Sequence, residues 1–142
     1  MSEVEALDRS RRRMLLGLLI GFGVWQSVSI AKALVGGARF PRGVYLGLMA
    51  VSLAGGAYWG FELLQMLRWA RRVRRNPELA ATLNDERVQV VRLKALAVAL
   101  VAVLTAQAIP ILAPIPAVVG GQVTILVGVT VAIGAYLTLD EG

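Results

Sequence analysis

Long apolar stretches alternate with short polar connections along the chain. Met14–Ile30, Val44–Leu67, Ala95–Ile109 and Ala117–Leu139 are apolar blocks that together contain one charged residue, Glu62. A helix needs about 20 apolar residues to cross the hydrocarbon core of a bilayer, so each block predicts a membrane span once the third is extended. We therefore predict an all-α fold, a four-helix transmembrane antiparallel bundle that forms one integral membrane domain over residues 1–142. The predicted spans are about 14–31, 44–67, 91–112 and 117–139, with a cytoplasmic loop at 68–90.

The distribution of basic residues predicts which way this bundle faces. Twelve of the fifteen lysines and arginines precede span one or lie between spans two and three, whereas Lys32, Arg39 and Arg42 lie between spans one and two. Connections rich in Lys and Arg remain on the inner side of the membrane, so we expect both termini and the central loop in the cytoplasm.

The first span has an alternative interpretation as a secretory signal peptide. Residues 9–33 combine an arginine-rich start, an apolar run and the small-residue pattern Ala31-Lys32-Ala33. This order is typical of a cleaved signal. The lysine inside the cleavage pattern favours an uncleaved anchor.

The central connection contains two helix-start signals. Asn76-Pro77-Glu78 places a capping residue, a proline and an acid in the order that begins a helix. Asn84, followed by Asp85 and Glu86, is a second start, from which a helix would run through Arg92 into span three and on to Leu112. The connection is therefore expected to contain helix.

Small residues recur within all four predicted spans and indicate where helices approach closely. The four stripes are Gly17 and Gly21; Ser52, Gly56 and Gly60; Ala95, Ala99, Ala102 and Ala106; and Gly120, Thr124, Gly128 and Ala132. Packing within one bundle is the favoured interpretation, and a homodimer formed through one stripe is the alternative.

The composition excludes several classes of function. The chain has no Cys and no His, which excludes disulfide scaffolds, thiol nucleophiles, Cys/His zinc sites and Ser-His-Asp catalysis. Its nine acidic residues are scattered, so we expect no metal site, no cofactor and no enzymatic activity. The net charge of +6 is concentrated beside membrane ends, where arginine meets anionic lipid, so direct nucleic-acid binding is not expected.

Two sets of residues are candidate functional sites. One is a contact surface for a soluble cytoplasmic protein or for anionic lipid: Arg68, Arg71, Arg72, Arg74, Arg75, Asp85, Glu86, Arg87 and Arg92. The other is an intramembrane polar site formed by Glu62 and Gln65, because ionisable residues inside a membrane are costly and often functional. The structural alternative is that Glu62 pairs with Lys94 or with an N-terminal arginine.

The segment Asn84-Asp85-Glu86-Arg87, followed by Arg92 and an apolar helix from Ala95, resembles a known junction. It is similar to the loop-to-span junction of small uncharacterised bacterial multi-span inner-membrane proteins with an Asp-Glu-Arg motif, over roughly residues 76–108. Genes of some such proteins neighbour small helix-turn-helix regulators, which implies a membrane antagonist of a transcription factor. The resulting hypothesis is a non-enzymatic inner-membrane anchor, accessory subunit or regulator. The alternative is a small oligomeric proton-coupled transporter that uses Glu62.

Overall fold

The described part of the chain consists of helices joined by short connections. A computed structural model describes residues 3–35, 40–83, 86–108 and 115–139. Its helices are α1 (Glu3–Val35), α2 (Arg42–Arg74), α3 (Pro77–Leu83), α4 (Glu86–Ala106) and α6 (Ala117–Leu139). Within these residues four helices, all but α3, are long and apolar enough to cross a membrane.

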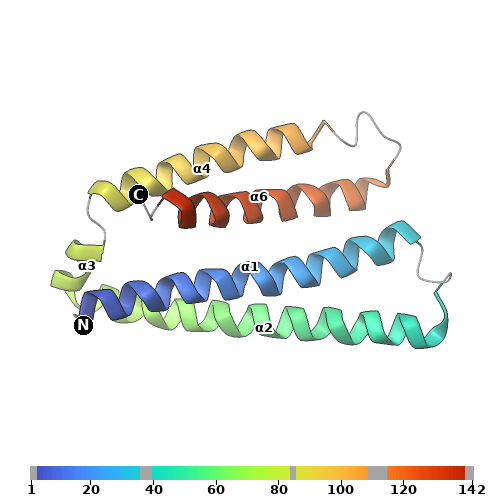
Figure 1. Ribbon diagram of the computed structural model, residues 1–142, viewed down its shortest axis with the longest axis horizontal. Coiled ribbons are helices and arrows are strands. Elements are labelled where there is room, and N and C mark those ends of the chain that lie inside the picture. Colours follow the sequence, from blue (N-terminus) through green and yellow to red (C-terminus); the bar gives the residue numbers. More distant parts are fainter. Residues whose placement is uncertain (1–2, 36–39, 84–85, 109–114, 140–142) are drawn as a thin grey trace.

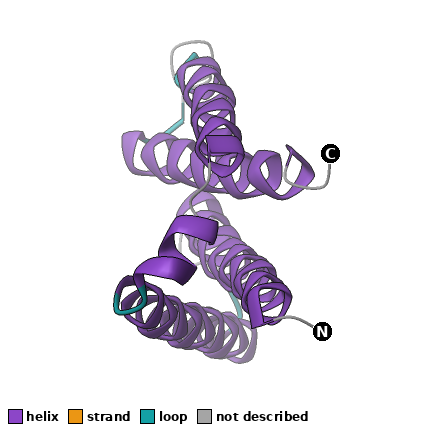
Figure 2. Ribbon diagram, turned by 90° about the vertical axis from the view of Figure 1, so that its left-hand side faces the viewer, coloured by secondary structure: helices purple, strands orange, loops and turns teal. Residues whose placement is uncertain are grey.

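The four long helices form two antiparallel hairpins that pack on each other. Helix α1 packs along α2 and helix α4 along α6, and contacts between α1 and α6 join the two pairs. Figure 1 shows the pairs one above the other, and Figure 2 shows the same separation viewed along the helices. Helices α2 and α4 do not pack side by side, so the bundle is open. The short connection between the third and fourth predicted spans favours an antiparallel hairpin of these two spans, and α4 and α6 pack in this way. The predictions of an all-helical fold and of four helices long and apolar enough to cross a membrane are confirmed for the described residues.

Three glycines bring α1 and α2 into close contact. A Cβ atom at Gly21 would lie 2.9 Å from the backbone nitrogen of Trp59, and one at Gly55 would lie 3.1 Å from the backbone nitrogen of Trp25. At Gly17 the same atom would lie 2.7 Å from Cδ of Glu62. The short stripe predicted in the first span is therefore an internal packing surface.

The stripe predicted in the second span is only partly right. Ser52 is buried as expected, but Gly56 meets Trp25 only at 3.8 Å, and a Cβ atom at Gly60 would have no neighbour within 4 Å. The residues that face α1 are Ser52, Gly55, Trp59 and Glu62. Spacings of three and four residues define the contact face of a tilted helix pair better than a strict spacing of four.

Small residues also bring α4 and α6 together. Ala95, Ala99 and Ala106 are buried on α4, and Gly120 and Thr124 are buried on α6. Near the far end of this hairpin, Gln107 Nε2 donates a hydrogen bond of 3.1 Å to Thr124 Oγ1. The stripes predicted in the third and fourth spans thus lie at this interface.

The helix ends differ from the predicted limits of the first three spans. Helix α1 runs from Glu3 to Val35 and so includes the arginines that precede the first predicted span. Helix α2 continues past residue 67 to Arg74, because arginine favours helix and the run stops only at Asn76-Pro77. Helix α3 begins at Pro77 and α4 at Glu86, close to both predicted start signals. Helix α4 ends at Ala106, and the end of the third predicted span, at Leu112, lies outside the described residues.

Candidate functional site

The arginine-rich residues gather at one end of the molecule. In Figure 1 the start of α1, the end of α2, helix α3, the start of α4 and the end of α6 all lie at the left-hand end. The five arginines of the run, Arg68, Arg71, Arg72, Arg74 and Arg75, are exposed there. Four of them belong to the last two turns of α2, so they stand on a helix and not on an irregular loop. We call this region the basic end.

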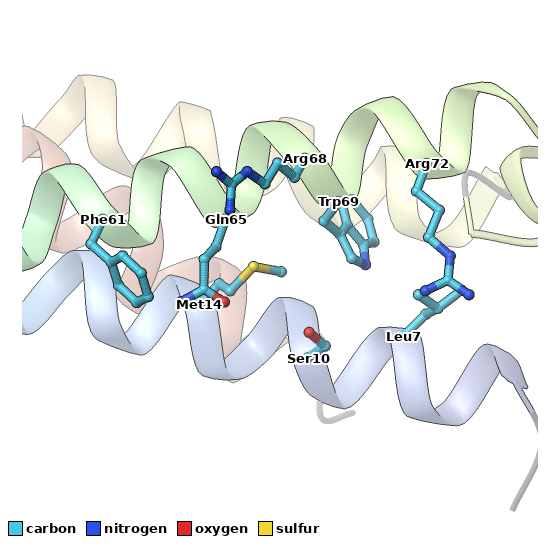
Figure 3. Close-up of a pocket in the computed structure, with 8 residues that line it drawn as sticks. All are labelled: Leu7, Ser10, Met14, Phe61, Gln65, Arg68, Trp69 and Arg72. Carbon is cyan, nitrogen blue, oxygen red and sulfur yellow. The ribbon is translucent and has the colours of Figure 1, made fainter.

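A groove opens between α1 and α2 at the basic end. It has a volume of about 400 Å³. Its lining residues are Leu7, Ser10 and Met14 of α1 and Phe61, Gln65, Arg68, Trp69 and Arg72 of α2. Figure 3 shows these side chains between the two antiparallel helices, with Phe61 at one end of the groove and Arg72 at the other. One end of the groove is therefore aromatic and the other is cationic; we call it the α1–α2 groove.

A second hollow adjoins the cationic end of this groove. It has a volume of about 260 Å³ and is lined by Arg68, Arg71, Arg72 and Arg75. Arg71 and Arg72 follow Arg68 by three and four residues, and Arg75 follows them by four and three, so the four lie along one side of the helix. Arg68 and Arg72 line both hollows. Arg74 lines neither, although it is also exposed.

Trp69 joins the groove to helix α3. Its ring packs against the buried pair Leu7 and Val73, which Ala80 of α3 also contacts. The indole Nε1 is buried and has no hydrogen-bond partner among the described residues. Figure 3 shows the indole directed from α2 toward α1. The groove therefore has an unsatisfied donor at its wall.

Two N-terminal arginines have a structural role at the junction of the hairpins. Arg11 is buried, forms an ion pair with Asp8 and lies over the ring of Tyr136, with its guanidinium carbon 5.4 Å from the ring centroid. Arg12 donates a hydrogen bond of 3.4 Å to the carbonyl oxygen of Leu137. Both contacts connect the start of α1 to the end of α6.

Glu62 is buried in the α1–α2 interface. It is 6% exposed, and its side chain lies where Gly17 has no side chain of its own. Tyr58, one turn earlier on α2, lies close enough to interact with it electrostatically. The ion pair expected with Lys94 or an N-terminal arginine is not formed between residues that the structure describes. Gln65 lines the α1–α2 groove and Glu62 does not, so the predicted polar pair does not share a cavity.

The remaining predicted contact residues lie on the other hairpin or beyond the described part. Glu86 and Arg87 are exposed at the start of α4. Arg92 lines a smaller hollow of about 240 Å³, together with Leu15 and Tyr136 among others. Asp85 lies outside the described residues. The structure thus groups the arginines of α2 with one another and places Arg87 and Arg92 on a helix that does not pack on α2.

The groove contains residues that sequence reasoning did not select. Leu7, Ser10 and Met14 of α1 share one helix face, as do Phe61, Arg68 and Trp69 with their neighbours on α2. These two surfaces face each other because of the antiparallel register of α1 and α2. In the sequence, each surface is visible as residues spaced by three and four positions, but this spacing does not identify which helix packs against which.

No group of three or more metal-ligating side chains occurs among the described residues. Comparison of the chain with protein-family models, with curated proteins and with solved structures gives no match.

Proposed function

We propose that this chain is a non-enzymatic integral protein of the bacterial inner membrane with both termini in the cytoplasm. It acts as an anchor, accessory subunit or regulator by docking a soluble cytoplasmic protein on its basic end. Membrane insertion is supported by four helices of sufficient length and apolar character. The resemblance of residues 76–108 to Asp-Glu-Arg proteins of bacterial inner membranes is the basis for the bacterial setting.

The observation that carries the docking proposal is the helical scaffold under the arginines. Helix α2 has 33 residues, about 50 Å at 1.5 Å per residue, whereas the hydrocarbon core is about 30 Å thick. Its basic end can therefore project beyond the lipid while remaining helical. Arginines held on a helix lose less conformational freedom on binding than arginines on a loop, which favours recognition of an acidic protein surface.

The orientation of the chain can be tested by labelling, because the sequence contains no Cys. Gly43 and Arg74 are both exposed and lie at opposite ends of α2. An impermeant maleimide added to intact cells is expected to label Gly43→Cys, and to label Arg74→Cys only after permeabilisation. Labelling of Arg74→Cys in intact cells would contradict a cytoplasmic basic end.

The docking surface can be tested by photo-cross-linking in native membranes. A photoreactive residue at position 74 is expected to capture one discrete soluble protein, because that side chain is exposed on the basic end. The combined change Asp85→Ala, Glu86→Ala and Arg87→Ala is expected to lower this cross-link at least fivefold, as measured by mass spectrometry of the purified adduct. Arg42→Ala, at the opposite end of α2, is the matched control and is expected to have no effect.

Recovery of no soluble protein, or an unchanged cross-link in the triple variant, would contradict the docking proposal.

A small oligomeric proton-coupled transporter is the second candidate. The observation in its favour is the buried Glu62, which has no ion pair among the described residues. Such carboxyl groups inside a membrane are frequent components of proton pathways.

A further inference from the structure

We propose that the α1–α2 groove binds one anionic phospholipid, with the phosphate held between Arg68 and Arg72 and an acyl chain lying along Phe61 and Met14. The inference rests on the membrane insertion assumed in the proposed function, but it requires no soluble partner. It differs from general attraction between a basic surface and an anionic membrane, because it assigns one lipid to one groove.

The order of side chains along the groove matches the order of groups in a phospholipid. Phe61 lies inside the apolar stretch of α2, and Arg72 lies eleven residues later in the basic run. This separation corresponds to about 16 Å along the helix. Met14 provides apolar wall near Phe61, Leu7 lies beside Arg72 at the other end, and Ser10 and Gln65 place a hydroxyl and an amide between the two ends. An acyl chain, a glycerol ester and a phosphate would meet apolar, polar and cationic side chains in turn.

The volume of the groove limits what it encloses. About 400 Å³ is within the range of about 300–1,000 Å³ that is usual for small-molecule sites. The groove therefore accommodates a head group, the glycerol and the first part of one chain. The rest of the lipid would remain against the exposed apolar surface of α2, which includes Leu64 and Leu67.

The arginines determine which head group is accepted. Arg68 and Arg72 are one helical turn apart, and in Figure 3 the Arg68 side chain points toward Gln65 while that of Arg72 points toward Leu7. Both side chains are exposed, so their guanidinium groups can turn toward one phosphate, and each matches a pair of phosphate oxygens. Arg71 and Arg75 add two further positive charges in the adjoining hollow. A zwitterionic lipid would bring its ammonium group close to these arginines, whereas an uncharged glycerol head group would not. The groove is therefore selective for anionic over zwitterionic phospholipid.

Trp69 is a third contribution to the site. Its buried Nε1 has no hydrogen-bond partner among the described residues, and an unsatisfied buried donor is costly. Tryptophan is also enriched at the depth of the lipid head groups, where one part of the ring is apolar and the other is polar. An ester or phosphate oxygen in the groove would supply the missing acceptor.

The test is native mass spectrometry of the full-length protein, purified in mild detergent and supplied with phosphatidylglycerol or phosphatidylcholine. The wild type is expected to retain one phosphatidylglycerol with at least fivefold preference over phosphatidylcholine. Arg68→Gln combined with Arg72→Gln is expected to reduce this retention at least fivefold. Arg9→Gln combined with Arg13→Gln removes the same charge from exposed positions outside both hollows, and is expected to change it less than twofold.

A second variant keeps every arginine and blocks the groove instead. Ser10→Trp introduces a large side chain from an exposed position on the groove wall and is expected to displace the lipid. Ala6→Trp, at an exposed position that does not line the groove, is expected to retain it. Circular dichroism checks that all variants keep their helix content.

The proposal is overturned if the wild type retains no lipid or shows no head-group preference, if the control pair loses the lipid as strongly as the groove pair, or if Ser10→Trp has no effect. Glycerol 3-phosphate supplied alone distinguishes the two sources of phosphate. It is expected to give no retained adduct, and equal retention would assign the groove to a soluble phosphate ester. A soluble protein cross-linked at position 74 would still support the docking proposal in each of these cases. The lipid proposal can therefore fail while the docking proposal holds.

Discussion

Replacing Gly21 with leucine is expected to lower the free energy of unfolding by about 3 kcal/mol, near the upper end of the range for overpacked interiors. A Cβ atom at this position would lie 2.9 Å from the backbone nitrogen of Trp59 and 3.0 Å from Cδ1 of Tyr58. The backbone cannot rotate away as a side chain can, so α1 and α2 must separate. In lipid, close packing largely drives helix association, so no other interaction compensates for the lost contacts between α1 and α2.

The measurement is SDS titration of the protein in mild detergent, followed by tryptophan fluorescence. Trp25 and Trp59 report on this interface directly, since their ring centroids lie 5.8 Å apart. Phe22 completes the cluster, with centroids 6.2 Å from Trp25 and 6.1 Å from Trp59. Separation of α1 from α2 exposes both indoles, so their emission is expected to change in the same transition.

Gly60→Leu is the matched control on α2. A Cβ atom there has no neighbour within 4 Å, so the substitution is expected to change stability by less than about 0.5 kcal/mol. A loss as large as that of Gly21→Leu would contradict the interface seen here. If the loss appeared together with disappearance of a cross-linked dimer, it would instead support self-association through the stripe of Ser52, Gly56 and Gly60.

The sequence was sufficient to predict the helices because lipid imposes simple requirements on length and polarity. The fourth predicted span coincides with α6 at Ala117–Leu139. The two helix-start signals correspond to the beginnings of α3 and α4. Such predictions succeed because backbone hydrogen bonds in lipid must be satisfied within the segment, and because caps act locally.

The contact face of α2 was harder to predict for a local reason. Gly55 and Gly56 are adjacent, so the helix offers two small-residue faces about 100° apart. The face that contacts α1 is the one on which Trp59 and Glu62 fit against Gly21 and Gly17. That fit depends on shapes brought together by tertiary packing and is absent from the spacing of residues within α2.

The open arrangement of the bundle and the α1–α2 groove both depend on which helices pack together and in which register. Four apolar helices with short connections are compatible with several neighbour relations, and the pairing of α1 with α6 depends on contacts such as Arg11 over Tyr136. The arginine run alone predicted only a charged surface. Its assembly with Ser10 and Met14 into a groove required the register between α1 and α2.

Replacing Glu62 with glutamine is expected to separate the two candidate functions. The carboxyl group is buried inside a predicted span without an ion pair among the described residues, and burial of a charged group there costs several kcal/mol. The amide has nearly the same shape, so it can occupy the same space beside Gly17. We expect the variant to fold and to unfold at higher SDS concentration, with a gain of about 1–2 kcal/mol.

A transporter that uses Glu62 predicts a different outcome. In vesicles reconstituted with the purified protein, wild type would show substrate-dependent proton flux and Glu62→Gln would abolish it. Under the docking proposal neither protein shows such flux, and the variant gives the same cross-link at position 74 as the wild type. Flux that is present in wild type and lost in the variant would therefore displace the docking proposal in favour of the transporter.

A double-mutant cycle between Glu62 and Gly17 can separate the effects of packing and of charge at Glu62. Glu62→Ala is expected to lower stability by about 2 kcal/mol, because it leaves a cavity beside Gly17. Gly17→Ala alone is expected to destabilise, since its Cβ atom would lie 2.7 Å from Cδ of Glu62. In the double variant the new methyl group occupies space vacated by the carboxyl side chain, so the two losses should not add. Additive losses would mean that Glu62 does not occupy the space above Gly17, and the burial on which its intramembrane role depends would have to be withdrawn.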